Sequence, residues 1–565
     1  MKKEESKEIK VGVDAYVKIA NKYAEEGDLL KALSFLRSAY NFNPYNFQVI
    51  LDIARIYADM SLFELSNKFL YRYMDKAPSS FTNKAYEELA INYFYLDNLW
   101  ASGYYFHKKL KEDGFLNTEA LDQDIADFLH NVDKKKDGYF LAYPFDRADY
   151  SYRIKAGKRA LSAGEYVTAS FIYSSIPKEV MDEETSGDYA ISCFLCGFDD
   201  KMKDACKDSL SRHGENVTAY CNLSNYYRDK GDLDKSRYYF EKALSVRKGG
   251  EDEPYKLATC AVELGVDEIA NECLAKIVEE RPFDDVMNFF YGISYLNLGK
   301  YELGLKYVKR AYSINEEDVI YRYYVKYAST LIEGQNSNVN DLPIKYQKDF
   351  PERITTRYKR AIRSTVKGNP PKKIKENELL EMLRWGITYP SESLQKACVC
   401  IAGAMQGKKG FDFLKESLLN PNVRDEIKKL ALITLITSGC KEKISVLARV
   451  FFVKVKPRKT LFSGTEDEKV YLPAYALALT TAVYSGIEDH EKIGFSVNKL
   501  YKKYNQEILL EQFKTEELSA LIICSAGIEK VKNDEEICKI FSVEEKRIQN
   551  LLRLIRGDEE NDKND

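Results

Sequence analysis

Histidines are the first side chains to consider, because imidazole is the commonest general base and metal ligand near neutral pH. The chain has four, and they lie far apart at His107, His130, His213 and His490. None stands in a Ser-His or Cys-His arrangement that would activate a nucleophile. Both Gly-rich phosphate-binding patterns, GxxxxGK[ST] and GxGxxG, are also missing from the sequence. We therefore predict that the protein is not an enzyme, has no catalytic residues and takes no small-molecule substrate.

Cysteine thiols offer a second kind of chemistry. Cys193 and Cys196 are separated by two residues, with Cys206 and His213 nearby. A structural zinc site of this type needs a second closely spaced pair to complete a tetrahedron, and none follows. Buried free thiols are the more common state of such cysteines. We predict no metal site and no cofactor.

A basic stretch between residues 353 and 375 contains nine Lys and Arg. Four of its residues recur at helical spacing and would make one stripe: Arg353, Arg357, Arg360 and Lys367. With Arg363 they make five candidate contact residues. Such a stripe can contact the phosphates of a nucleic acid. The alternative is pairing with acidic groups elsewhere in a chain whose net charge is only −3. Nucleic-acid binding at these five residues is therefore a second hypothesis beside the one developed below.

The sequence repeats with a period of 34 residues, and this period indicates the helices of which much of the chain is built. Its clearest units begin at Val217, Glu251 and Asp285. The eighth residue of each unit is small, which lets two helices approach closely: Ser224, Ala258 and Gly292. The fifteenth is glycine, which suits a tight turn between helices: Gly231, Gly265 and Gly299. Weaker copies begin at Val13 and continue toward residue 113.

These positions resemble those of the tetratricopeptide-repeat (TPR) family, whose unit is an antiparallel helix pair. The resemblance implies an all-α fold, a right-handed superhelical solenoid in which neighbouring units bury each other's apolar faces. It also implies a non-enzymatic scaffold that binds a peptide or helical segment of another protein in the groove of the solenoid.

In that family the groove is lined by the first helix of each unit, at about its second, fifth, ninth and twelfth positions. Applied to this chain, the resemblance predicts these groove residues: Asn21, Gln48, Arg55, Asn225, Arg228, Tyr255, Thr259, Phe289, Ile293, Tyr323 and Tyr327. Each could instead be a solvated or helix-packing residue. Val17 stands where the carboxylate-binding subclass has lysine, so we do not expect capture of a C-terminal carboxylate.

The C-terminal third is expected to be helical but different. Pro421 to Arg424 opens an apolar stretch that resembles a HEAT repeat, and residues 537–551 resemble a helix-turn-helix hairpin. The predicted domains are a first TPR block (1–113), an irregular connector (114–148), a second TPR block (149–333), a HEAT-like region (334–530), the hairpin (531–556) and a disordered acidic tail (557–565). The hairpin adds to the nucleic-acid hypothesis, although Glu544 and Glu545 would repel phosphates.

Composition supports a folded chain, with 45% hydrophobic and 31% charged residues over 565 positions. The N-terminus is charged and has no apolar core of a signal peptide. The longest apolar runs, such as 430–437, are too short to cross a bilayer. We predict a cytoplasmic protein that does not contact membranes and whose partner is another protein.

Overall fold

The computed structural model describes most of the chain, with gaps. The described residues are 12–113, 140–142, 147–162, 164–250, 252–334, 342–368, 374–405, 408–487, 489–504, 513–528 and 534–561. They form two compact units. The first unit holds residues 1–67 and 78–352, and the second holds residues 68–77 and 353–565.

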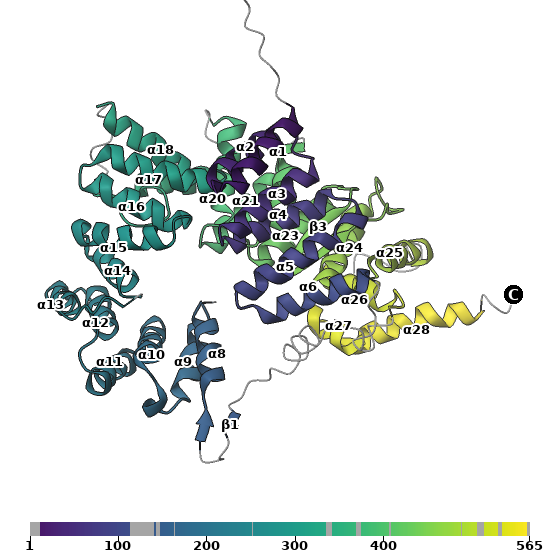
Figure 1. The fold of residues 1–565 in the computed structure, drawn as a ribbon. Helices are drawn as coiled ribbons and strands as arrows, with labels where there is room; N and C mark the ends of the chain where they lie inside the picture. Colours follow the sequence, from purple (N-terminus) through teal and green to yellow (C-terminus); the bar gives the residue numbers. More distant parts are fainter. Residues whose placement is uncertain are drawn as a thin grey trace, which may run out of the picture. The chain divides into compact units, whose positions relative to one another are not determined.

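The first unit is built from antiparallel helix pairs (Figure 1). Its N-terminal block contains α1 (Val13–Glu25), α2 (Leu29–Phe42), α3 (Phe47–Asp59), the start of α4 (Phe63–Lys76), α5 (Asn83–Tyr95) and α6 (Leu99–Glu112). Its second block contains α8 (Ser151–Ser162), α9 (Tyr166–Ser174), α10 (Glu183–Leu195), α11 (Asp199–His213), α12 (Val217–Asp229), α13 (Leu233–Ser245), α14 (Glu253–Leu264), α15 (Asp267–Glu280), α16 (Asp285–Asn297), α17 (Tyr301–Ile314) and α18 (Val319–Ile332). The predicted all-α repeat fold is confirmed.

Short-range signals define the limits of these helices. Asp232 accepts a hydrogen bond from the backbone N–H of Lys235 and so caps α13. The predicted turn glycines have positive φ, at 78° for Gly231, 68° for Gly265 and 73° for Gly299. A residue with a Cβ is strained in this left-handed region. The 34-residue period therefore comes from helix pairs joined by glycine turns.

Two short strands lie within the predicted connector of residues 114–148 and at its edge. Strand β1 (Phe140–Ala142) pairs with β2 (Arg147–Asp149) as an antiparallel hairpin. The remainder of that connector, including the predicted helical part, lies outside the described residues.

The second unit is mainly helical. It contains α19 (Glu352–Val366), α20 (Glu376–Gly386), α21 (Glu392–Ala404), α22 (Lys408–Leu419), α23 (Asp425–Thr437), α24 (Glu468–Tyr484), α25 (His490–Tyr504), α26 (Thr515–Cys524), α27 (Asp534–Phe541) and α28 (Glu545–Asn561). It shares α19 and α4 with the first unit, since α19 begins one residue before the boundary and α4 crosses it. The HEAT-like arrangement remains a prediction.

One feature of the second unit corrects the expectation of helices alone in region 334–530. Strands β3 (Ile444–Ala448) and β4 (Phe451–Val455) form an antiparallel hairpin. Their β-branched and aromatic residues favour strands, and Arg449 takes the left-handed conformation in the tight turn, with a φ of 57°. Ser445 on β3 donates a hydrogen bond of 2.6 Å to Asp75, and the Phe452 ring stacks on Tyr71. The hairpin thus packs on the C-terminal half of α4.

The C-terminal end brings a second correction. Helix α28 continues to Asn561, so residues 557–561 are helical where we expected disorder. Glutamate is a good helix former, which explains why Glu559 and Glu560 extend the helix. The rest of the predicted tail, residues 562–565, lies outside the described part of the chain.

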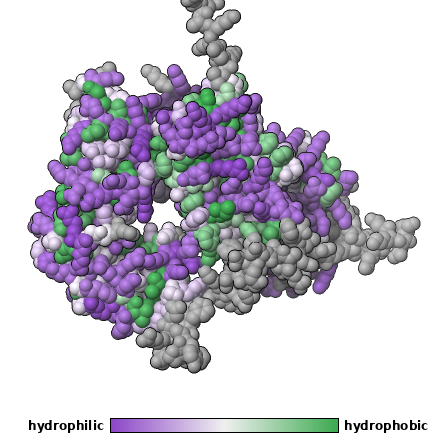
Figure 2. All heavy atoms as spheres, in the orientation of Figure 1, coloured by the Kyte–Doolittle hydropathy of each residue, from purple (hydrophilic) through white to green (hydrophobic). Residues whose placement is uncertain are grey.

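Hydrophilic side chains dominate the described surface visible in Figure 2. In the described part of the chain, no helix has both the length and the apolar character needed to cross a bilayer.

Candidate peptide-binding surface

The predicted groove residues fall into two groups by exposure. Those on the surface or half-buried are Asn21, Gln48, Arg55, Asn225, Arg228, Tyr255, Thr259 and Tyr323. Three others are buried, and for them the prediction of a surface position is wrong: Phe289 and Ile293 are 0% exposed and Tyr327 is 4% exposed. The Phe289 ring lies 5.2 Å from the ring of Tyr321 and 5.1 Å from that of Tyr324. Apolar packing between α16 and α18 therefore takes up Phe289 instead of leaving it free for a partner.

Both predicted groove arginines already hold ion pairs. The Nε atom of Arg55 lies 2.8 Å from a carboxylate oxygen of Glu88. Arg228 lies 2.9 Å from Glu263 in the same way. A partner's carboxylate would have to compete with these intramolecular pairs. Half-exposed pairs of this kind contribute little to stability, so such competition is feasible.

A different part of the second block shows how it holds a chain segment. Residues 344–350, which we call the docked segment, follow α18 and lie against α15, α16 and α18. Ile344 and Phe350 are buried, and Tyr346 and Lys348 are half-buried. Lys345 and Gln347 between them are exposed. Asp349 is half-buried, and the backbone is bent at residues 346–349. The segment thus turns Ile344, Tyr346, Lys348 and Phe350 toward the helices without being a regular extended strand.

Asn297, at the end of α16, binds the backbone of the docked segment. Its side-chain oxygen accepts a hydrogen bond of 2.7 Å from the backbone N–H of Ile344. Its side-chain N–H donates to the Ile344 carbonyl at 3.0 Å and to the carboxylate of Asp267 at 2.9 Å. The side-chain amide of Asn297 therefore binds both backbone groups of Ile344, and its hydrogen bond to Asp267 fixes its orientation. Such pairing holds any residue type, because it uses only backbone atoms.

Tyr346 occupies the next position on this surface. Its hydroxyl donates a hydrogen bond to the carboxylate of Asp267, and its ring meets that of Phe290 edge-on with the centroids 6.2 Å apart. Burial and the neighbouring carboxylate raise the pKa of Tyr346 well above its usual range. The hydroxyl is therefore a donor at every physiological pH.

Lys348 enters an acidic pocket at the starts of two helices. Its ammonium lies 3.1 Å from Asp318 and 3.5 Å from Asp285, and 4.7 Å from the centroid of the Tyr321 ring. The side chains of Asp285 and Asp318 are only 14% and 16% exposed. Burial opposes the charged form of Lys348, but the two carboxylates outweigh it and the pKa is raised. The pocket thus holds a cation.

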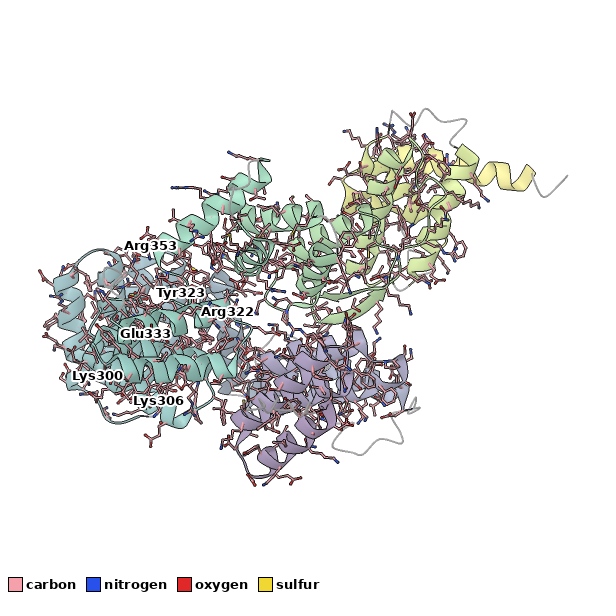
Figure 3. All side chains as sticks on the ribbon, turned by 90° about the horizontal axis from the view of Figure 1, so that it is seen from above. Lys300, Lys306, Arg322, Tyr323, Glu333 and Arg353 are labelled. Atoms are coloured by element: carbon pink, nitrogen blue, oxygen red, sulfur yellow. The ribbon has the colours of Figure 1, made fainter. Side chains whose placement is uncertain are left out.

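Phe350 completes the contacts. Its ring lies edge-on to Tyr323 of α18, with the centroids 5.4 Å apart, and it is 7% exposed. Tyr323, labelled in Figure 3, is the predicted groove residue that the structure brings into this site. We call the helix residues that contact the docked segment the acceptor face: Asp267, Asp285, Phe290, Asn297, Asp318, Tyr321 and Tyr323.

Sequence reasoning missed most of the acceptor face because it considered only four positions of each first helix. Asn297 is the thirteenth residue of its unit, and Asp267, Asp285 and Asp318 lie at helix starts. One signal was available in the sequence. Ile344, Tyr346 and Phe350 lie two or four positions apart and alternate with the polar Lys345 and Gln347, which is the pattern of a segment with one buried side.

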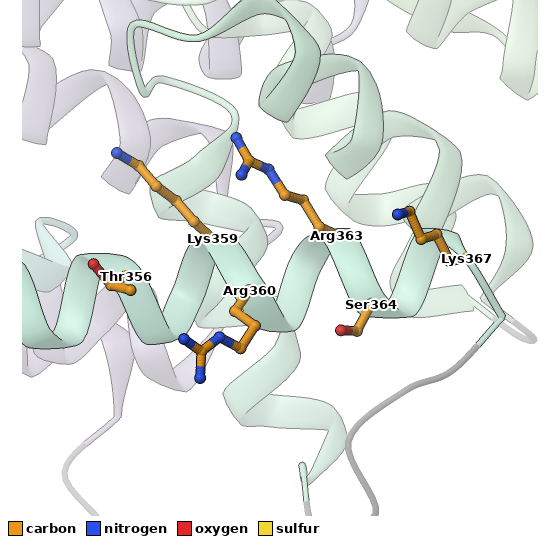
Figure 4. A pocket seen from close by; sticks show the side chains of 6 residues that line it. All are labelled: Thr356, Lys359, Arg360, Arg363, Ser364 and Lys367. Carbon is orange, nitrogen blue, oxygen red and sulfur yellow. The ribbon is translucent and has the colours of Figure 1, made fainter.

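The basic stripe lies on α19, in the second unit. Arg357 pairs with Glu378 at 2.6 Å, and Lys359 donates to the Tyr389 hydroxyl at 2.6 Å. Among the described residues, no carboxylate forms an ion pair with Arg360, Arg363 or Lys367. Together with Thr356, Lys359 and Ser364 these three line an open hollow of about 410 Å³ (Figure 4). The structure therefore divides the predicted stripe into paired and unpaired cations.

The cysteines form no composite site in the described residues. All eleven are free thiols, and most of them are buried. Burial raises the pKa of Cys206 to about 12, so this thiol stays protonated and unreactive. No group of three or more His, Cys, Asp or Glu in the described chain is placed to hold a metal ion.

Comparison with known proteins supports the repeat assignment. The family model of the tetratricopeptide repeat matches residues 217–249, which contain α12, α13 and the glycine turn between them. Residues 217–249 of this chain thus match one tetratricopeptide repeat. The TPR repeat-containing protein YvcD of Bacillus subtilis (strain 168) is 23% identical over 275 residues, which are 48% of this chain and 55% of that protein. The chain thus spans about half the length of this curated TPR relative.

Solved TPR structures show low similarity. Yeast Tom70 is 11% identical, with 94% of this chain and 99% of that chain covered at a TM-score of 0.26. YrrB, a TPR protein with an unusual peptide-binding site, is 15% identical, with 32% and 92% covered at a TM-score of 0.23. At such TM-scores this likeness carries no argument about how the helices of the TPR blocks are arranged.

Proposed function

We propose that this protein is a non-catalytic scaffold whose second TPR block binds a non-helical segment of a partner protein on the acceptor face. One observation carries the proposal: the acceptor face holds the docked segment through the backbone of Ile344 and through the side chains of Tyr346, Lys348 and Phe350. Backbone pairing supplies affinity and side-chain pockets supply specificity, which is the division of labour in extended-peptide recognition.

The experiment uses the docked segment as its own probe. In an opened variant, Ile344, Tyr346, Lys348 and Phe350 are all changed to Ser, so that the segment no longer fills the acceptor face. A fluorescent peptide with the sequence of residues 341–352 is then titrated into this variant and followed by anisotropy. We expect saturable binding, and we expect Asn297→Ala in the same background to weaken it by about tenfold, because two hydrogen bonds are lost.

A matched control peptide distinguishes sequence-specific binding to the acceptor face from non-specific binding. A peptide of the same composition, in which Ile, Tyr, Lys and Phe each move one position along the chain, should not bind. The proposal is contradicted if the opened variant keeps its helical circular dichroism and binds neither peptide.

A second candidate function rests on the unpaired cations of α19. We infer that Arg360, Arg363 and Lys367 could contact nucleic-acid phosphates, since guanidinium and ammonium groups without intramolecular partners are available to them. The triple change of these residues to Glu should abolish salt-dependent retention on DNA. The control makes the same charge change at Lys22, Lys31 and Lys235, which are already paired with carboxylates. If the wild type is not retained at low salt, this candidate is wrong.

A further inference from the structure

We propose that the docked segment is an internal occupant that a partner must displace, and that the acceptor face selects a partner segment carrying Lys or Arg between two aromatic residues, each two positions away. The inference rests on the proposed function and adds the chemistry of the ligand and its regulation.

The docked segment is tethered but sparsely held. Only one of its residues, Ile344, has both backbone groups bonded to Asn297. Further along, the segment bonds to itself, from the N–H of Gln347 to the carbonyl of Lys345 at 2.8 Å and from the N–H of Asp349 to that of Gln347 at 2.7 Å. The chain continues into α18 and α19 on either side, so the local concentration of the segment is high whatever its intrinsic affinity. A free ligand must therefore compete with it.

Charge selection follows from the pocket that receives Lys348. Two carboxylates, Asp285 and Asp318, face one ammonium, so the filled pocket keeps one negative charge. Asp285 is the first residue of α16 and Asp318 caps α18, and the positive end of a helix dipole stabilises such carboxylates. The aromatic face of Tyr321 adds a second attraction for a cation. A Glu or Asp in this position would meet two like charges.

Selection of the preceding aromatic residue follows from Asp267. Its carboxylate accepts hydrogen bonds from the Tyr346 hydroxyl and from Asn297. Asp267 thus couples binding of a tyrosine to the orientation of the Asn297 amide, which binds the backbone of the segment. On the other side of the cation, Tyr323 offers a ring edge to an aromatic residue, as it does to Phe350.

The test compares two peptides on two chains. The peptides have the sequence of residues 341–352 with either Lys348 or Lys348→Glu, and the chains are the opened variant and the intact protein. On the opened variant we expect the Lys348→Glu peptide to bind about thirtyfold more weakly. We expect the intact protein to bind the Lys348 peptide at least about tenfold more weakly than the opened variant does, because its own segment competes.

A variant of the acceptor face tests charge without disturbing the helices. Asp285→Asn with Asp318→Asn, made in the opened variant, removes both charges, while Asn still caps α18. The preference for the Lys348 peptide should then fall below about threefold. Asp284→Asn, which changes the cap of α16, serves as the control and should leave the preference intact.

The outcomes are distinct. Equal binding of both peptides to the opened variant overturns the charge selection and leaves the scaffold function standing. Equal binding of the Lys348 peptide to intact and opened chains overturns the role of the segment as an occupant. No binding of either peptide to the opened variant contradicts the proposed function itself.

Discussion

At the scale of single residues, two lysines that are shielded from water have pKa values shifted in opposite directions. Lys348 is half-buried beside two carboxylates, and its pKa is raised. Lys428 of α23 is 2% exposed, and its ammonium donates to the backbone carbonyl of Leu447 at 3.1 Å. Burial lowers the pKa of Lys428 to about 8, with a smaller opposing effect from Asp425. A charged lysine is thus favourable in the acceptor face and costly in the second unit.

The cost of Lys428 gives a prediction with a definite sign. Its pKa is about 8 when folded and 10.5 when unfolded, so the unfolded state binds more protons between these values. The contribution of Lys428 to the free energy of unfolding must therefore rise with pH from about 8 to 10.5, by about 3 kcal/mol at most. We expect Lys428→Met to be more stable than the wild type at pH 7, with the difference shrinking as the pH rises through this window. Urea unfolding at several pH values measures it.

Lys441→Met is the control for this experiment, because Lys441 is exposed and should give no such pH-dependent difference. If the free energies of unfolding of Lys428→Met and the wild type differ by the same amount from pH 7 to pH 10.5, burial of the charged Lys428 does not destabilise the protein.

At the scale of elements, two glycines allow the close approach of α16 and α17 in the second block. A Cβ added to Gly292 would lie 2.6 Å from a methyl carbon of Val308 and 2.9 Å from its backbone nitrogen. A Cβ added to Gly304 would lie 2.4 Å from Leu296. Helices α16 and α17 therefore approach through backbone contact, and α16 in turn carries Asp285, Phe290 and Asn297 of the acceptor face.

This contact predicts that Gly292→Ala destabilises the protein. Alanine usually stabilises a helix by about 1 kcal/mol relative to glycine. Here overpacking against the Val308 backbone should reverse the sign and cost about 1–3 kcal/mol. Thermal unfolding measures the effect. Gly250→Ala, where an added Cβ finds only ordinary contact, should be close to neutral, and a stabilised Gly292→Ala would refute the close approach.

At the scale of the whole molecule, one arginine joins distant parts of the first unit. Arg37 of α2 is 8% exposed, and its guanidinium donates to the carbonyls of Ser313 and Ile314 at 2.5 and 2.8 Å. It also donates to the Tyr57 hydroxyl at 2.7 Å. The N-terminal block thus caps the carbonyl end of α17, where a cation is favoured by the helix dipole.

Loss of this arginine should loosen the end of α17. We expect Arg37→Met to lower the free energy of unfolding by about 2 kcal/mol, because buried carbonyls lose charge-assisted hydrogen bonds. Faster hydrogen exchange should appear in residues 310–318. Arg37→Lys should rescue the protein only partly, since an ammonium lacks the planar fork. Unchanged exchange in these residues would show that Arg37 does not join the two blocks.

The sequence alone determined the helix pairs of the TPR blocks. Gly231, Gly265 and Gly299 mark turns because positive φ is a local requirement that glycine meets without strain. Helix caps such as Asp232 act over three residues. The glycine turns repeat every 34 residues, so the period could be recognised without knowledge of the fold. The strand hairpin β3–β4 was missed because short apolar runs do not separate strand from helix by periodicity.

Only the tertiary structure decided which side chains face a ligand. Phe289 and Tyr327 hold positions that the family exposes, yet both are buried, and Phe289 packs on the rings of Tyr321 and Tyr324. Asn297 and Asp267 come from different helices and meet residues 344–350 across 47 or more positions of the chain. Contacts at such separations depend on the stacking of whole helix pairs. No local pattern encodes them, and the acceptor face therefore appears only in the folded protein.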